Sequence, residues 1–135
     1  MPMQALIPVD VAEACRLWLV AHGVDACCDP LPQDLERRLP LVLVQPLGGS
    51  RADVVVDSFG VRLYGWAPTY EAAIANVSEA AGVLSAMAGQ VVDESQCYAV
   101  SVDALPYPAH DPSHQDIPRA CTTATVTMRA KAIEI

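Results

Sequence analysis

The feature that most constrains the fold is a change of hydrophobic period between residues 61 and 88. Up to Trp66, apolar and polar residues alternate with the period of two that places successive side chains on opposite faces of a strand. Pro68 disfavours helical geometry at the residue before it, and the Thr69 hydroxyl can accept hydrogen bonds from the free amides of a helix start. From Tyr70 onward, apolar residues recur at helical spacing. The pattern predicts a strand ending at Trp66 and a helix over 70–88, which form a scaffold without a catalytic signature.

Composition sets the class of protein. The chain has 135 residues, which suits a single domain over 1–135. Its 16 acidic and 8 basic residues give a formal net charge of -8. Recognition of DNA relies on Lys and Arg that neutralise phosphates, so a DNA-reading module is excluded, whereas DNA could pass an acidic surface without adhering. No apolar run approaches the roughly 20 residues of a membrane helix, and the first ten residues lack signal-peptide features, so we expect no membrane association and a cytoplasmic origin.

The cysteines form no recognisable framework. There are five, an odd number, with one adjacent pair and no Cys-x-x-Cys spacing, which argues against a disulfide scaffold and a zinc site. Cys15 lies in a predicted helix, and Cys97 and Cys121 lie in predicted strands. In such positions a free thiol acts as a small buried apolar group.

The remaining pattern predicts a first helix, further strands and two loops. Asp10 followed by Glu13 is typical of a capping box, and a helix from there should end near residues 21–22, before Gly23. Predicted strands cover 41–44, 53–66, 95–102 and 119–131, with a turn near 57–60 and a Pro-, Asp- and His-rich loop over 103–118. Gly48-Gly49 is best explained as a tight turn or hairpin tip.

This order of elements is αββαββ. Two helices cannot enclose a core alone, so the economical arrangement places both on one face of a single sheet. The predicted fold class is therefore α+β, a two-layer sandwich of two helices on a mostly antiparallel four- to five-stranded sheet. The 103–118 loop should project from that sheet, because it lies between two pairing strands. Its length is typical of functional or disordered loops.

Two segments contain residues that could form a metal site or a phosphate-binding loop. His110, Asp111, His114 and Asp116 could supply metal ligands, but the surrounding prolines specify no rigid scaffold for a metal site. The segment Gly48-Gly49-Ser50-Arg51 lacks both the following helix and the Gly-Lys-Ser of a phosphate loop. We expect no catalytic residues, no metal and no cofactor.

One strand face carries aromatic and cationic residues together. Arg62, Tyr64 and Trp66 alternate with Val61 and Leu63. Ordinary packing of a partly covered sheet face explains this set, and so does a contact between subunits, because aromatic residues and Arg are enriched at interfaces. The residues alone leave both interpretations open.

In four places the chain resembles the tail terminator, or tail completion, proteins of long-tailed bacteriophages, especially those of actinobacterial phages. The first is the opening helix over 7–19, and the second is the strand and Gly-Gly turn over 41–51. The third is Val-Val-Val-Asp at 54–57, followed by the strand ending in Gly-Trp-Ala and the Thr-initiated alanine-rich helix. The fourth is a strand, a Pro- and Asp-rich loop and the terminal Thr-Ala-Thr-Val-Thr-Met-Arg-Ala at 123–130. Residues 24–40 and the His-containing loop depart from the family pattern.

The resemblance implies a virion structural protein with no enzymatic activity. A single domain would assemble in the host cytoplasm as a homohexameric ring on the head-proximal end of the tail, where it ends polymerisation of the tail tube. Its partners would be other copies of itself, the tail tube protein and the head-completion or connector proteins, with genomic DNA passing through the lumen without specific binding. The candidate subunit-interface residues are Gly48, Gly49, Arg51, Arg62, Tyr64, Trp66, Tyr107, His110 and His114.

Two alternatives remain from the same inventory of elements. Another head–tail connector or a tail-tube subunit would also be a small ring-forming protein, and a tube subunit would polymerise into long tubes. A ferredoxin-like domain that binds a small molecule would need a concave pocket with convergent polar groups. The sequence offers no compact set of such groups.

Overall fold

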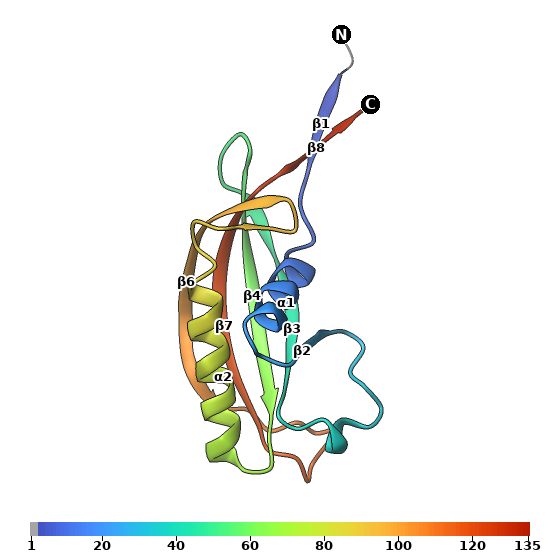
Figure 1. The fold of residues 1–135 in the computed structure, drawn as a ribbon, viewed down its shortest axis with the longest axis vertical. Helices are drawn as coiled ribbons and strands as arrows, with labels where there is room; N and C mark the ends of the chain where they lie inside the picture. Colours follow the sequence, from blue (N-terminus) through green and yellow to red (C-terminus); the bar gives the residue numbers. More distant parts are fainter. Residues whose placement is uncertain (1–2) are drawn as a thin grey trace.

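The computed structural model describes residues 3–135 (Figure 1). Within them the chain forms two α-helices, one short 3₁₀ helix and eight strands. The helices are α1 (Val11–Ala21) and α2 (Tyr70–Ser85), and the 3₁₀ helix is Leu35–Arg37. The strands are β1 (Gln4–Ile7), β2 (Ala26–Cys28), β3 (Leu41–Arg51), β4 (Val56–Trp66), β5 (Val91–Val92), β6 (Ser95–Pro108), β7 (Arg119–Arg129) and β8 (Lys131–Glu134).

Six strands form one mixed sheet in the order β2-β3-β4-β7-β6-β5. The β2–β3 pair is parallel and the other pairs are antiparallel. Strands β1 and β8 pair only with each other, as a separate antiparallel ribbon. The predicted αββαββ sandwich with four to five strands was therefore wrong. Strands of two to four residues are too short to show a period, which is why β1, β2, β5 and β8 were missed.

Both helices begin at the predicted residues. The Asp10 carboxylate accepts the backbone N–H of Glu13 at 3.1 Å, and the Thr69 hydroxyl accepts that of Ala72 at 3.1 Å. The first helix ends at Ala21 with His22 as its C-cap, and Gly23 follows with a φ of 86°, a conformation that suits glycine. The second helix ends at Ser85, slightly before the predicted residue 88. These caps satisfy amides that no helical carbonyl can reach.

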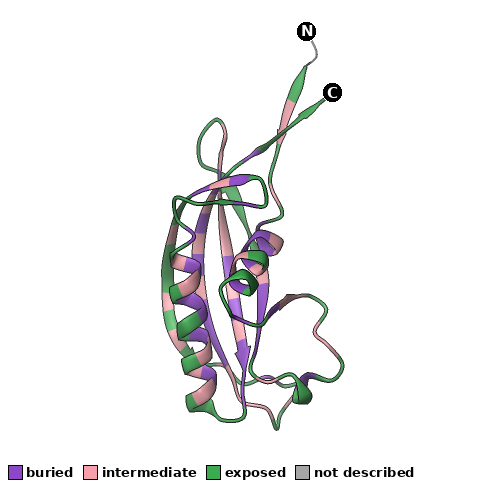
Figure 2. Cartoon of the chain, in the orientation of Figure 1, coloured by how far each residue is buried: buried purple, intermediate pink, exposed green. Residues whose placement is uncertain are grey.

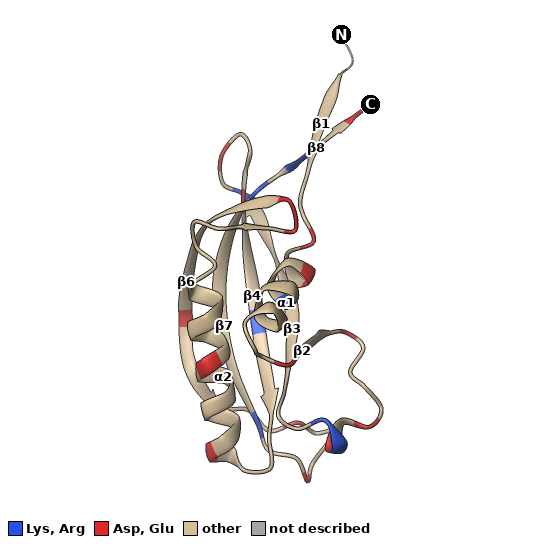
Figure 3. Ribbon diagram, in the orientation of Figure 1, with Lys and Arg blue, Asp and Glu red and all other residues tan. Residues whose placement is uncertain are grey.

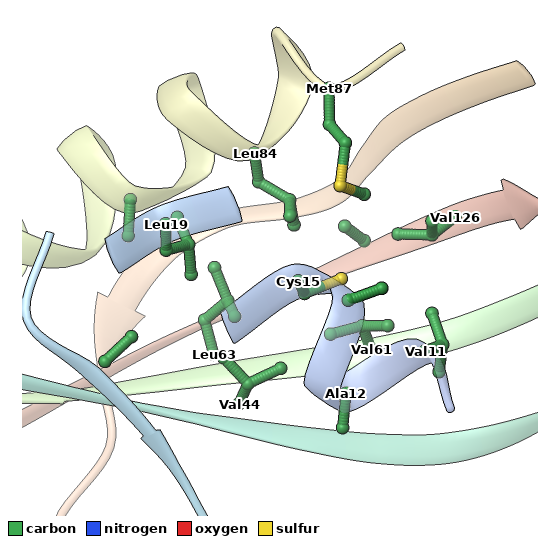
Figure 4. Close-up of a cluster of buried hydrophobic side chains, with 14 of the residues drawn as sticks. Val11, Ala12, Cys15, Leu19, Val44, Val61, Leu63, Leu84, Met87 and Val126 are labelled. Atoms are coloured by element: carbon green, nitrogen blue, oxygen red, sulfur yellow. The ribbon is translucent and has the colours of Figure 1, made fainter. Parts of the chain in front are cut away.

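The main core lies between the two helices and the sheet. Figure 4 shows Cys15 and Leu19 of α1 and Leu84 of α2 gathered above Val61 and Leu63 of β4. These five side chains are at most 1% exposed. The buried residues of both helices face the sheet in Figure 2, and their outer surfaces are exposed. This one-sided covering leaves the opposite face of the central strands without a helix (Figure 1).

The β3–β4 hairpin differs from the prediction in its turn. The chain reverses at residues 52–55, where the Ala52 and Asp53 amides donate to the Val56 carbonyl. The predicted turn at 57–60 is instead part of β4, and Gly48-Gly49 lies inside β3 at a register shift between Pro46 and Gly49. A β-bulge explains why glycines that suggested a hairpin tip occur within a strand.

The predicted projecting loop is mostly not a loop. Strand β6 continues to Pro108, and residues 109–118 fold back against the sheet beside β7. Prolines are tolerated because β6 pairs with β5 only at Ser95 and Gln96, and the last outer backbone hydrogen bonds join Cys97 to residues 89–90. The outer edge from residue 98 therefore needs no N–H donor. Three register shifts along the β6–β7 pairing interrupted the alternation that would have marked this strand.

Candidate interaction surface

The sheet face opposite the helices is the first part of the candidate surface. Register places Arg62 of β4 beside Thr123 of β7, and Tyr64 beside Cys121. Arg62 and Tyr64 are half-buried, and the Arg62 guanidinium donates to the Tyr64 hydroxyl at 3.3 Å. Thr123, Thr125 and Thr127 continue the face along β7. The result is a largely polar face that includes the half-buried Tyr64 ring and can contact solvent or a partner.

Trp66 has a different environment from Tyr64, although both lie on the same strand face. Its side chain is only 1% exposed and packs with Leu35, Leu41 and Leu43. The indole N–H donates to Oδ2 of Asp111 at 3.0 Å. Trp66 therefore serves as a core residue beneath residues 109–118, and it presents no surface to a neighbouring molecule.

Asp111 is the centre of a buried polar cluster. Its carboxylate accepts from the indole of Trp66, from the backbone N–H of Ser113 at 2.9 Å and from Nδ1 of His114 at 2.9 Å. The Arg119 guanidinium lies 3.9 Å from Oδ1, the oxygen that accepts from Ser113, whereas Trp66 and His114 donate to Oδ2. Burial disfavours the charged form, but the hydrogen bonds and Arg119 outweigh it and hold the pKa of Asp111 below its usual value. Asp111 is therefore a structural anion.

Arg119 fastens the 109–118 segment to the sheet. Its side chain donates to the carbonyl oxygens of Ala109 at 2.7 Å and His110 at 2.9 Å. The same guanidinium lies 4.0 Å from the centroid of the Tyr64 ring, within cation–π range. The side chain of His110 is exposed, and only its backbone takes part in this contact.

The suggested metal ligands do not converge. Asp111 and His114 contact each other, whereas His110 and Asp116 are exposed at separate positions along the segment. Among residues 3–135, no three His, Cys, Asp or Glu side chains are grouped as they would be around a metal ion. The Asp111 carboxylate is instead occupied by donors from the protein itself.

The second part of the candidate surface is the outer edge of β6. Four large apolar side chains on this strand are exposed: Tyr98, Val102, Leu105 and Tyr107. Leu105 is 80% exposed and Tyr107 is 45% exposed. Beyond Gln96, β6 has β7 on one side and no described strand on the other. We call residues 97–108 the β6 edge. From Tyr98 onward it combines apolar side chains with a backbone edge that no described strand covers. This surface was not predicted, because the segment from residue 103 was assigned to a loop.

The Gly48–Arg51 segment lies at the end of β3, beside the start of β4 and far along the strands from Trp66. An alanine Cβ at Gly49 would lie 1.9 Å from the carbonyl oxygen of Ser58, so this glycine permits close approach of β3 and β4. Arg51 forms an ion pair with the buried carboxylate of Asp57. With Pro8 and Phe59, these residues line a shallow recess of about 350 Å³. Arg51 is therefore already engaged within its own chain.

A larger recess lies between α2 and the segment before β3. It has a volume of about 460 Å³, and its polar lining includes Asp25, Arg37, Arg38, Asn76 and Glu79. Arg38 lies 3.6 Å from Asp25, so part of its charge is compensated. These residues could not be grouped from the sequence, because residues 24–40 show no regular hydrophobic period. The recess is the feature that a small-molecule-binding domain would use.

The part of the chain that the structure describes contains no helix with the length and apolar character needed to span a bilayer. Comparison of the chain with protein-family models and with curated protein sequences finds no match. A proposal for the function therefore rests on the surfaces described above.

Proposed function

We propose that this chain is a structural protein of a long-tailed phage virion, a tail terminator that forms a ring on the head-proximal end of the tail tube. The ring would end tube polymerisation and present the surface for head-completion proteins. The resemblance described above is the reason for proposing the tail terminator family. The β6 edge is the observation that supports self-assembly.

The β6 edge is a surface suited to contact with another chain. An edge strand offers unpaired N–H and C=O groups, which makes it a template for pairing. The exposed Leu105 and Tyr107 add apolar area where most edge strands carry charges. Asp103 is the only charged residue between Ser95 and Pro108. A strand with this composition favours burial in an assembly over permanent exposure to water.

Ring geometry requires two different surfaces on each subunit. Pairing of one β6 edge with another would close at a dimer, whereas head-to-tail contact between unlike surfaces generates a ring. The opposite edge of the sheet, β2, is three residues long and differs from β6 in length and composition. The net charge of -8 fits a lumen through which DNA moves without adhering.

The decisive experiment is the mass of the purified protein by light scattering, with negative-stain imaging of the same sample. Closed rings of about six subunits, or monomers that form rings on added tail tubes, support the terminator. Long tubes would move the assignment to a tail-tube subunit. Monomers with no affinity for tubes would overturn the proposal and favour a ligand-binding domain.

A matched pair of variants tests the role of the β6 edge. Leu105→Glu places a charge on the edge and should shift rings to smaller species. Val20→Glu makes the same kind of change on α1, where Val20 is 47% exposed, and should leave rings intact. Equal behaviour of the two variants would show that the β6 edge is not an assembly surface.

A further inference from the structure

The ribbon of β1 and β8 extends beyond the end of the six-stranded sheet (Figure 1). We call residues 3–7 and 131–135 the arm. Its strands pair from Gln4 with Glu134 to Ile7 with Lys131, and the Ile135 amide donates to the Met3 carbonyl at 2.9 Å. Neither strand joins the large sheet. A two-stranded ribbon alone is at best marginally stable in water, so the arm is a candidate for support by another chain.

The arm has one apolar face. In an antiparallel pair, residues directly opposite each other point to the same side. Met3, Ala5, Ile7, Ile133 and Ile135 therefore share one face with Lys131, and Gln4, Leu6, Ala132 and Glu134 occupy the other. Met3 is 68% exposed and Ile135 is 70% exposed. Figure 2 shows the ribbon as mostly exposed. Ile7 and Ile133 are 38% and 36% exposed, so the subunit covers this apolar face only in part.

We infer that the arm of one copy docks, apolar face inward, against the β6 edge of the next copy. This inference rests on the proposed ring and names the two unlike surfaces that a ring requires. Figure 1 places the arm beyond one end of the sheet and β6 along a lateral edge, so the two surfaces lie at different places on the subunit. Each copy then gives an arm to one neighbour and receives an arm from the other.

Charge complementarity favours a second copy as the occupant. Lys131 is the only charged side chain on the apolar face of the arm, and Asp103 is the only one on the β6 edge. Figure 3 shows β6 as almost entirely uncharged. Among the described residues, the ion pairs of the subunit use neither of them. The Asp103 carboxylate accepts hydrogen bonds from the hydroxyls of Ser101 and Thr125, which leaves its negative charge without a cation. Docking would pair Lys131 with Asp103.

The lengths of the two surfaces are also compatible. At about 3.3 Å per residue, the four-residue pairing of the arm spans about 13 Å and the 12-residue β6 edge about 40 Å. The arm can therefore lie along the edge beside Leu105 without meeting the end of the strand. Docking of this kind buries the apolar side chains of the arm against those of the β6 edge, and the burial of apolar surface supplies the affinity.

The test compares two double variants of the full chain. Ile133→Glu with Ile135→Glu places two charges on the apolar face. Gln4→Lys with Ala132→Lys places two charges on the opposite face, where position 4 lies opposite Glu134 and the ribbon gains no like-charge pair. The first pair should raise the concentration needed for ring formation at least tenfold, and the second should leave it nearly unchanged. Rings that persist unchanged in the first variant overturn the arm inference while leaving the ring function intact. A wild-type chain that forms no rings, alone or on tail tubes, overturns the ring function itself.

A mixing experiment identifies the partner surface. The Leu105→Glu variant keeps its arm, and the Ile133→Glu, Ile135→Glu variant keeps its β6 edge. Each variant alone should be monomeric. Mixed in equal amounts, they should form a one-to-one heterodimer in light scattering, because only one intact arm and one intact β6 edge are present per pair. Arm-to-arm pairing predicts normal assembly of Leu105→Glu and no heterodimer, and that result would overturn the inference.

A charge exchange provides a second readout. Lys131→Glu and Asp103→Lys should each weaken assembly, and a chain that carries both changes should recover at least part of the loss. A double variant no better than the worse single variant would contradict contact between these side chains.

Discussion

The indole N–H of Trp66 and the carboxylate of Asp111 form a hydrogen bond of 3.0 Å between residues 45 positions apart. Both side chains are almost fully buried, at 1% and 5% exposed. This bond fixes the segment after β6 onto the sheet face that neither helix covers. It also decides between the two interpretations of the Trp66 side chain, because a ring buried beneath its own chain cannot contact a neighbour.

We predict that Asp111→Ala destabilises the fold. The change leaves the buried N–H of Trp66 without its acceptor, and an unsatisfied buried polar group costs about 1–3 kcal/mol. Asp116→Ala, at an exposed position of the same segment, should stay within about 0.5 kcal/mol of wild type. Urea unfolding followed by Trp fluorescence measures both. Equal stabilities of the two variants would contradict an anchoring role for Asp111.

The pH dependence of stability should report the same carboxylate. The pKa of Asp111 is lower in the folded chain than the value of about 3.9 for an unperturbed Asp, so the unfolded chain binds its proton more tightly. The stabilisation is therefore complete above the unfolded pKa and is lost as the pH falls through the folded pKa. The free energy of unfolding of wild type relative to Asp111→Asn should fall between about pH 5 and pH 2. If the free energies of unfolding of wild type and Asp111→Asn change in parallel over this pH range, Asp111 does not contribute to the pH dependence.

Much of the scaffold could be predicted from local chemistry. The caps at Asp10 and Thr69 and the end of β4 at Trp66 depend on neighbouring residues, and each was confirmed. The turn at 52–55 and the extension of β6 depend on pairing between distant strands. A glycine that allows strands to approach and a glycine that allows a turn are alike in sequence, so Gly49 suggested the wrong structure.

The candidate surface was only partly visible in the sequence. Arg62, Tyr64 and Trp66 share a face as the alternation required, but their different burial depends on residues 109–118, which fold over only one end of that face. The β6 edge and the arm were not predicted as surfaces. Both follow from which strands have neighbours in the sheet, a property of the whole topology that no local pattern records.

The two glycines in β3 should respond differently to alanine. At Gly49 the added Cβ would overlap the Ser58 carbonyl oxygen, a backbone atom that cannot move without disturbing the hairpin. Overpacking of this kind costs typically about 1–3 kcal/mol, or more. At Gly48 the space is open, and the strain arises only from its φ of 84°, which favours glycine by about 1–2 kcal/mol. Gly49→Ala should therefore have a lower melting temperature than Gly48→Ala in thermal unfolding. The reverse order would contradict the bulge geometry.

Thiol reactivity should separate the cysteines into two groups. Burial is the main cause that raises the pKa of Cys15 to about 12, and Cys97 and Cys121 are also buried. Cys27 and Cys28 are partly exposed, although burial raises their pKa values as well. Since the thiolate is the reactive form, iodoacetamide at pH 8 should modify only the adjacent pair in the folded chain. Mass spectrometry of the labelled peptides would contradict this if Cys15 reacted first.

Asn76 gives a prediction in the opposite direction, towards higher stability. Among the described side chains, its amide nitrogen is the buried polar atom without a hydrogen-bond partner, and it lies near Gly65, where α2 approaches β4. An unpartnered polar group opposes burial, so Asn76→Leu removes a penalty of about 1–3 kcal/mol and improves helix propensity. We expect Asn76→Leu to be at least as stable as wild type in urea.

Ala75→Leu, at the exposed neighbouring position, controls for added apolar area. If Asn76→Leu instead lowers stability by more than about 1 kcal/mol while Ala75→Leu does not, the amide has a bonding partner in solution, and the recess beside it becomes the place to search for a bound molecule.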